Sequence, residues 1–407
     1  MGAIFQKKVS PLETYKPSCA VDNTNTIEYL EWIAHPTLST HGWSKIKKHV
    51  KKYRNLKSID FDFKCILGRG TIGTVYLVKL KSDSKYYAIK SIRRSSIVHR
   101  QNADKIRREL EILNRLRRCV FVAHLFAAFQ DEKHVCYLLE YGYGGELYTL
   151  IHSSKKYGKL NEGAVLFYTA EIACALNYLH ELKIAYRDLK PDNIVIDEQG
   201  HVRLVDFGLA LFVDDNGYVD NPSSSGTAEY LAPEITRGFK EPHGVQVDWW
   251  ALGIIMYEML YAKLPFGERP STTKYEIFMN INSVKYKFPR RSNISSSIKD
   301  LIKGLLTKNV NNRFKFSQIL SHPSFEGINN VQKITNFQLC PPVIPNDTSN
   351  IKLNTTGSIK KTTMKKISIG DHSHFKKWKE PRYKKKKPLT QAELQYTNIA
   401  GSGNSIQ

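Results

Sequence analysis

Two acidic strings contain the residues of this sequence that are best suited to chemistry. Residues 186–193 read YRDLKPDN, and Asp206-Phe207-Gly208 follows in the next segment. Three carboxylates and an amide gathered in one loop repel one another unless cations bind between them. Mg²⁺ with nucleotide phosphates is the natural occupant of such a cluster. Two unrelated Asx-rich turns would explain one string, but not both strings downstream of the glycine-rich loop at residues 68–75.

That glycine-rich loop suits phosphate binding. Gly68, Gly70 and Gly73 fit the pattern GxGxxGxV, in which the missing side chains let backbone amides approach phosphate oxygens. A dinucleotide-binding fold needs a helix after such glycines, whereas residues 74–80 (TVYLVKL) read as a strand. A Rossmann site is therefore disfavoured. A glycine-bearing β-hairpin without a ligand stays open as the alternative.

A lysine and a glutamate lie between this loop and the acidic strings. Lys90 ends the apolar run 87–90, and Glu109 lies in the charged helical segment 104–116. A strand lysine that points into a nucleotide cleft needs a carboxylate to hold its ammonium toward the phosphates, and Glu109 can supply it. Taken singly, the two residues also fit a lysine with its head in solvent and a solvated helix face.

The elements that must position these residues change in type along the chain. Apolar and polar residues alternate at 61–92 and at 135–139, which predicts strands, whereas helical stripes dominate beyond residue 146. Residues 249–260 are almost wholly apolar and predict a buried helix. The sequence therefore predicts an α+β fold in which a strand-rich lobe precedes a helix-rich lobe.

Composition sets wider bounds. The chain has 407 residues, is 41% hydrophobic and carries a formal net charge of +23, which suits a globular core with an anionic partner such as a nucleotide, a nucleic acid or a membrane surface. No apolar run reaches the length of a membrane-spanning helix. The six cysteines are scattered without CxxC spacing, so reduced structural thiols are expected rather than disulfides or a zinc site.

Together, the glycine loop, Lys90, Glu109 and the two acidic strings resemble the signature set of the protein kinases. The resemblance implies a bilobal fold, with an antiparallel β small lobe and a mainly helical large lobe, and implies ATP and Mg²⁺ as cofactors. It also implies the site residues. The catalytic set is Asp188 as the base for the substrate hydroxyl, Lys190 at the transferred phosphoryl group, Lys90 at the α- and β-phosphates and its partner Glu109. The metal ligands are Asn193 and Asp206, and the ATP contacts are Leu67, Gly68, Gly70, Gly73, Val75, Ala88, Lys90, Leu139, Glu140 and Tyr141.

Further motifs resemble the AGC group of Ser/Thr kinases, and within this group they are most similar to the cyclic-AMP-dependent kinase catalytic subunit. They are Lys190 two residues after the base and the stretches 226–234 (GTAEYLAPE), 247–253 (VDWWALG) and 340–350. The resemblance implies that Glu146, Asp192 and Glu258 receive substrate arginines at P-3 and P-2, three and two residues before the phosphorylated one, and that Thr227 lies beside the substrate in the P+1 loop. Ordinary helix and loop carboxylates remain the alternative.

The resemblance also divides the chain. Residues 1–60 form an N-terminal extension with a basic amphipathic helix near 43–50. Residues 61–325 form the kinase domain, with a small lobe at about 61–141 and a large lobe at about 142–325. Residues 326–407 form an AGC-type tail with a basic, partly disordered end.

Several positions depart from the pattern. Ser223, in a longer activation segment, occupies the family's phosphorylation position, where phosphate would meet Arg187 and Lys105. After residue 350 the tail lacks the family's Phe-Asp-Asp-Tyr element, and residues 375–378 keep a weak FxxF-like remnant. Gln6 stands where N-myristoylation of Gly2 expects Ser or Thr.

Partners and location follow from the same features. The expected partners are protein substrates with basic motifs and either a regulatory subunit or an upstream kinase, and nucleic acid is not expected at the core. The basic run 381–388 fits a nuclear import signal, an anionic-lipid patch or a solvated tail. The expected location is cytoplasmic, with the nucleus as the alternative. The rival function is a pseudokinase scaffold that binds nucleotide or partners without turnover.

Overall fold

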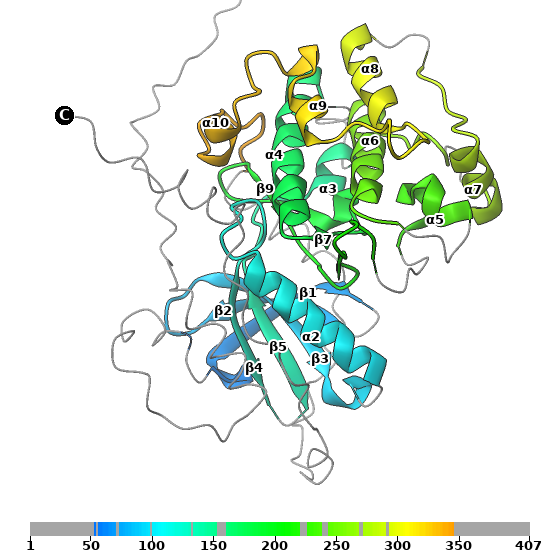
Figure 1. Cartoon of the computed structure of the whole chain (residues 1–407). Helices are drawn as coiled ribbons and strands as arrows, with labels where there is room; N and C mark the ends of the chain where they lie inside the picture. The colour runs from blue at the N-terminus through cyan, green and yellow to red at the C-terminus, as the bar shows by residue number, and fades with distance from the viewer. Residues whose placement is uncertain are drawn as a thin grey trace, which may run out of the picture.

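The computed structural model describes residues 53, 56–70, 73–97, 100–131, 133–152, 160–219, 226–237, 243–267, 272–289 and 293–345. These residues form a lobe built around one sheet, followed by a larger helical lobe (Figure 1). The expected order of the two lobes is confirmed. The expected helix at 43–50, Gly2, Ser223 and the tail motifs beyond residue 345 lie outside the described residues.

The small lobe contains a five-stranded antiparallel sheet with the order β1-β2-β3-β5-β4. One face of the sheet packs on its own apolar cluster, which includes Val78, Ile89 and Leu138. The other face lies under helix α2 (Figure 1). The strands are β1 (Phe61–Arg69), β2 (Gly73–Leu80), β3 (Tyr86–Arg93), β4 (Leu125–Gln130) and β5 (His134–Leu139).

Helix α2 (Arg100–Arg115) carries a buried stripe toward the core. Ile106, Glu109, Leu110 and Leu113 recur at the three- and four-residue spacing of one helix face, and all four side chains are buried. Three of them are apolar. The stripe therefore places one carboxylate, that of Glu109, among core residues next to the sheet.

The large lobe is organised around two buried helices. Asn161 caps helix α4 by accepting a hydrogen bond from the Ala164 N–H at 2.8 Å. Every residue of helix α6 from Val247 to Tyr261 is buried, which confirms the predicted core helix. The helices are α3 (Leu147–His152), α4 (Glu162–Glu181), α5 (Pro233–Arg237), α6 (Gln246–Tyr261), α7 (Lys274–Asn282), α8 (Ser296–Leu305), α9 (Phe316–Leu320) and α10 (Val331–Thr335).

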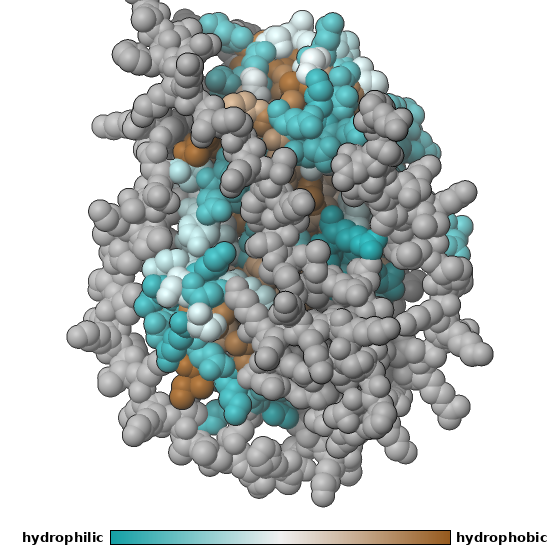
Figure 2. Space-filling model, turned by 90° about the vertical axis from the view of Figure 1, so that its left-hand side faces the viewer, coloured by the Kyte–Doolittle hydropathy of each residue, from teal (hydrophilic) through white to brown (hydrophobic). Residues whose placement is uncertain are grey.

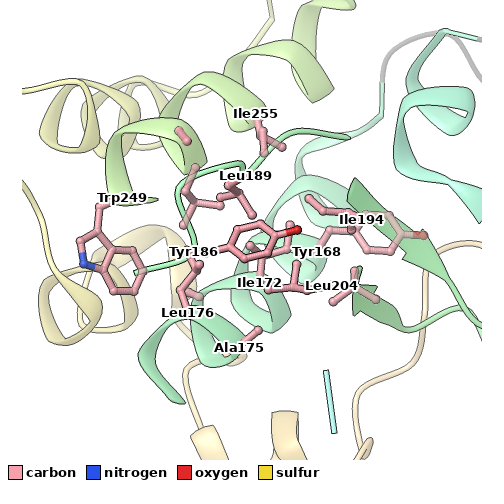
Figure 3. Packing of buried hydrophobic residues seen from close by; sticks show 14 of the residues in the cluster. Tyr168, Ile172, Ala175, Leu176, Tyr186, Leu189, Ile194, Leu204, Trp249 and Ile255 are labelled. Atoms are coloured by element: carbon pink, nitrogen blue, oxygen red, sulfur yellow. The ribbon is translucent and has the colours of Figure 1, made fainter. Parts of the chain in front are cut away.

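Short strands and 3-10 turns fix the loops of this lobe. β6 pairs with β8, β8 with β9, and β10 with β7. Figure 3 shows the loop residues Tyr186 and Leu189 among side chains of α4 and α6, including Ile172 and Trp249, so the loop that follows β7 is anchored in the core. These elements are β6 (Gly145–Glu146), β7 (Ile184–Ala185), η4 (Pro191–Asn193), β8 (Ile194–Ile196), β9 (Val202–Leu204), β10 (Leu211–Phe212) and η5 (Ala228–Tyr230).

The start of the C-terminal segment packs closely on the core. A Cβ on Gly200, whose φ is +97°, would lie 2.3 Å from the Val343 carbonyl oxygen, and one on Gly144 would lie 2.6 Å from Pro345 Cγ. Only glycine at these positions admits the segment so closely. The face shown in Figure 2 carries both hydrophilic and hydrophobic described residues. Within the described part of the chain, no helix is long and apolar enough to cross a membrane.

Candidate active site

The glycine-rich loop is the turn between β1 and β2. The backbone N–H of Gly70 donates to the Gly73 carbonyl at 2.8 Å. A Cβ on Gly68 would meet nothing within 4 Å, whereas one on Gly73 would lie 2.9 Å from the Ser91 carbonyl oxygen. Gly73 is therefore required for close strand packing, and Gly68 leaves open space above the turn. Both properties fit a loop that covers a phosphate chain.

Lys90 of β3 joins three elements of the site. Its Nζ donates to Glu109 Oε1 on α2 at 2.5 Å and to Asp206 Oδ1 at 2.9 Å. The predicted pairing of Lys90 with Glu109 is confirmed, and the contact with Asp206 extends it. The sheet, α2 and the second acidic string thus meet at one ammonium group.

Burial and the Lys90 ammonium shift the pKa values of the two carboxylates in opposite directions. Burial raises the pKa of Glu109, and the pull of Lys90 only partly offsets it. Burial would also raise the pKa of Asp206, but Lys90 and the Gly208 N–H outweigh it and leave the pKa of Asp206 below its usual value. The pKa of Lys90 is raised because both acids outweigh its own burial. Asp206 is therefore the anionic oxygen donor of the cluster.

The loop after β7 gathers the predicted catalytic residues. Lys190 Nζ lies 3.1 Å from Asp188 Oδ2 and donates to Thr227 Oγ1 at 2.9 Å. The Asn193 amide donates to the Asp188 backbone oxygen and to Oδ2, both at 2.8 Å. Burial raises the pKa of Asp188, against the opposing pull of Lys190. The structure thus brings these four residues together, as the sequence predicted.

A buried aspartate of α6 holds this loop, and sequence reasoning did not assign it a role. Asp248 is 1% exposed and accepts hydrogen bonds from the backbone N–H groups of Tyr186 at 2.9 Å and Arg187 at 2.8 Å. His180 of α4 hydrogen-bonds the same carboxylate at 2.8 Å. An acid among the apolar residues of α6, which carries only Asp248 and Glu258 as acids, was the available signal, since a buried carboxylate must find partners.

The residues predicted to contact ATP lie on the sheet and on the segment that leads from it into the large lobe. Ala88 pairs with Leu139 across β3 and β5, and Val75 pairs with Lys90 across β2 and β3. The residues after β5, Glu140 and Tyr141, continue into the large lobe, and Glu140 N–H donates to the His124 carbonyl at 2.8 Å. The predicted apolar contacts Leu67, Val75, Ala88 and Leu139 lie on strands of one sheet.

Comparison with known proteins identifies the family. The model of the protein kinase domain matches residues 61–325. The chain belongs to the protein kinase family. It is 37% identical to Serine/threonine-protein kinase Sgk1 of Danio rerio over 301 residues, and 34% identical to Serine/threonine-protein kinase MRCK beta of Homo sapiens over 316 residues. These alignments cover 72% and 76% of this chain, 66% of that Sgk1 and 18% of that MRCK beta, so the chain spans less than two thirds of either relative.

The kinase family implies a magnesium site, and the residues present fit one. In the described structure, the Asn193 side chain uses its amide nitrogen toward Asp188, and the contacts of Asp206 are made through Oδ1. The amide oxygen of Asn193 and Oδ2 of Asp206 therefore have no protein partner among the described residues. Hard oxygen donors of this kind suit Mg²⁺, which takes further ligands from phosphates and water.

The predicted substrate residues of this kinase fall into two groups. Glu146 and Asp192 are exposed, and partial burial, followed by the negative charge of Asp192, raises the pKa of Glu146. Glu258, which was also expected to receive a substrate arginine, is covered by other side chains. Its side chain is 2% exposed, and its two oxygens are bonded to His152 at 2.8 Å and to the hydroxyl of Tyr230 at 2.6 Å.

The activation segment of the kinase is held by backbone contacts. Tyr218 pairs with Gly244 in an isolated bridge, and the Val219 N–H donates to the His243 carbonyl at 2.9 Å. Arg187, expected to meet a phosphate on Ser223, is buried and donates to the Leu209 carbonyl at 3.2 Å. Burial lowers the pKa of this guanidinium, and Arg108 of α2 lowers it further. Arg108 is thus a nearby cation that the sequence did not single out.

Proposed function

We propose that this protein is a Ser/Thr kinase of the AGC type, which transfers the γ-phosphoryl group of MgATP to basic protein substrates. The observation that carries the proposal is the joining of Lys90, Glu109 and Asp206 beside the group formed by Asp188, Lys190 and Thr227. The family match and the names of the relatives support the same reaction class. The resemblance to the cyclic-AMP-dependent kinase stays a prediction.

Each residue of the site has a distinct role in the proposed phosphoryl transfer. Asp188 orients a substrate hydroxyl and accepts its proton, while the Asn193 amide holds Asp188 by donating to its backbone carbonyl and to its carboxylate Oδ2. Lys190, held between Asp188 and Thr227, supplies positive charge where the transferred phosphoryl group would pass. Magnesium held by Asn193 and Asp206 would neutralise the negative charge of the phosphates. Catalysis then depends on positioning and electrostatics rather than on a covalent intermediate.

Basic substrates are the fitting class because exposed carboxylates border this site. Glu146 ends strand β6, and Asp192 lies in the η4 turn next to Asn193. An arginine guanidinium between Glu146 and Asp192 would relieve the repulsion between the two acids. A preference for arginine at P-3 follows from this pair, and Glu258 would serve P-2.

The test is phosphate transfer from radiolabelled ATP, with magnesium, to an Arg-Arg-x-Ser peptide. We expect wild-type transfer, and a loss of at least about a thousandfold in kcat for Asp188→Ala and Asp206→Asn, with folded proteins in both cases by circular dichroism. Wild-type activity in Asp206→Asn would overturn the assignment. Nucleotide binding without transfer, in protein whose activation segment has been phosphorylated, would favour the scaffold.

A further inference from the structure

One stretch of the chain carries the basic pattern that is proposed for its substrates. Of the four Arg-Arg pairs in the sequence, only the pair in the string 93–96 (RRSS) has a serine two residues after it. Ser96 therefore has Arg93 at P-3 and Arg94 at P-2, which is the spacing of the Arg-Arg-x-Ser peptide. The kinase thus contains a serine that matches its own proposed selectivity.

Ser96 lies in a short turn at the surface of the small lobe. The 3-10 helix η3 (Arg94–Ile97) follows β3 and precedes α2, and none of its residues is buried. Arg93, the last residue of β3, and Ser95 are exposed, and Ser96 is partly exposed. A second protein can therefore reach the arginine at P-3 without any change in the fold.

Side-chain hydrogen bonds hold this turn in its folded form. The Ser96 hydroxyl donates to the Arg93 carbonyl at 2.6 Å, and the Asn102 side chain of α2 donates to the Ser96 carbonyl at 2.7 Å. Arg94 Nη1 donates to the Asp131 carbonyl at 3.1 Å. Because no residue of η3 is buried, the turn can open without unfolding the sheet or α2, as short surface elements do. The Ser96 hydroxyl is then available to a catalytic site.

We propose that Ser96 is a phosphorylation site, which one copy of this kinase modifies on another copy. The inference rests on the proposed kinase function. The Ser96 hydroxyl attacks the γ-phosphorus of MgATP bound to the other copy, and its proton passes to Asp188 of that copy. A bond forms between Ser96 Oγ and the phosphorus, the bond from this phosphorus to the β–γ bridging oxygen breaks, and ADP leaves.

The tether of Ser96 favours transfer between two copies over transfer within one. Arg93 pairs with His134 of β5, so placing it at Glu146 of its own chain would pull the end of β3 out of the sheet. The same strand carries Lys90, which the site needs. In a second copy, the exposed Arg93 side chain can meet Glu146 while β3 stays paired.

Phosphate on Ser96 would lie at the N-terminal end of α2. Asn102, in the first turn of this helix, holds the Ser96 carbonyl, and the first turn contains no acidic residue. Negative charge near a helix N-terminus stabilises the helix. Amide hydrogen exchange at residues 104–108 should therefore slow by about threefold after phosphorylation. The modification thus acts on the helix that carries Glu109.

The experiment uses two forms of the full chain. The acceptor is Asp188→Ala, which cannot phosphorylate itself and whose folding is checked by circular dichroism, and the enzyme is wild type with a tag that separates the two on a gel. After incubation with MgATP, mass spectrometry measures phosphate on the acceptor peptide that contains residues 95 and 96. We expect phosphate on Ser96.

Acceptor variants test the recognition. Adding Ser96→Ala should abolish phosphate in this peptide, whereas adding Ser95→Ala should leave it unchanged. Adding Arg93→Ala should slow the modification by about tenfold, because the contact at P-3 is lost. Lys85→Ala, which removes an exposed positive charge from the turn between β2 and β3, is the matched control and should have no effect. Phosphate on Ser95 in place of Ser96, or equal rates with Arg93→Ala and Lys85→Ala, would overturn the proposal.

Two further measurements complete the test. With wild type alone, the initial rate at Ser96 should rise with the square of the protein concentration; a rate per molecule that is independent of concentration would contradict transfer between copies. An Arg-Arg-x-Ser peptide in the same reaction separates this inference from the kinase assignment. If the peptide is phosphorylated and Ser96 is not, the inference fails alone. If neither is phosphorylated, the kinase function fails and the inference fails with it.

Discussion

Individual side chains of this site are tuned by the balance of burial against one ammonium group. Lys90 is the cation that lies between a fully buried acid, Glu109, and an acid at the edge of the cleft, Asp206. The two ion pairs hold the Lys90 ammonium where the ATP phosphates are expected. They also require charged groups to be buried, which is unfavourable. Removing the cation should therefore affect stability as well as catalysis.

Lys90→Met should make stability depend on pH. Glu109 is 3% exposed, and without Lys90 its pKa, already raised by burial, rises further in the folded state. The pKa of a glutamate in the unfolded chain is about 4.3. The free energy of unfolding of the variant should therefore fall as the pH rises above that value. At neutral pH it should be about 3 kcal/mol lower than that of the wild type. Thermal unfolding between pH 4 and 8 measures this. Lys90→Met/Glu109→Gln should lose the pH dependence; if the double variant keeps it, another group is responsible.

At the scale of elements, motifs that are each contiguous in sequence lie on different strands, helices and loops. The glycine turn, the Lys90 strand and the loop at 186–193 could be predicted because each is a short local pattern with its own chemistry. Asp248 and His152 could not, because their partners Tyr186 and Glu258 are distant in sequence and only the packing of α6 brings them close. The alternation of apolar and polar residues predicted the strands of the sheet. No local pattern predicted that α6 would contact the loop at 186–193.

The contact between the activation segment and the start of α6 offers an element-scale test. A Cβ on Gly244 would lie 1.8 Å from the Gly217 carbonyl oxygen, so Gly244→Ala must push the turn away and break the Tyr218 bridge. We expect about a tenfold loss of kcat/KM for peptide and faster limited proteolysis near residues 211–219, with ATP affinity kept. Gly163→Ala, whose Cβ would meet Asn161 Oδ1 at 3.5 Å, is the control. Equal proteolysis of both variants would contradict the docking role.

Across the whole molecule, the C-terminal segment is tied to the link between the lobes by one arginine. Arg203 of β9 lies 2.7 Å from Asp197 and 3.4 Å from Glu140, the residue that follows β5. Its guanidinium also lies over the ring of Phe337, 5.3 Å from the centroid. The tail sequence predicted an extension beyond the domain, but not that its first part would contact Arg203, the partner of Glu140.

Phe337→Ala tests whether this connection bears on nucleotide binding. Phe337 has a φ of 56°, and its ring centroid lies 5.5 Å from that of Phe121 and 4.3 Å from that of His201, so these two domain residues hold it in place against backbone strain. Without the ring, Arg203 loses one of its supports, and Glu140 should be held less firmly. We expect the KM for ATP to rise about threefold and the free energy of unfolding to fall by about 2 kcal/mol.

The tail offers a matched control in Leu339→Ala. Leu339 is also partly buried against the large-lobe core, but it makes no described contact with Arg203. Its truncation should lower the free energy of unfolding by a similar amount while leaving the KM for ATP unchanged. Steady-state kinetics at varied ATP concentration and thermal unfolding measure the two effects separately. If both variants weaken ATP binding equally, the effect comes from general loosening of the tail; if neither does, the tail supports the fold without reaching the nucleotide site.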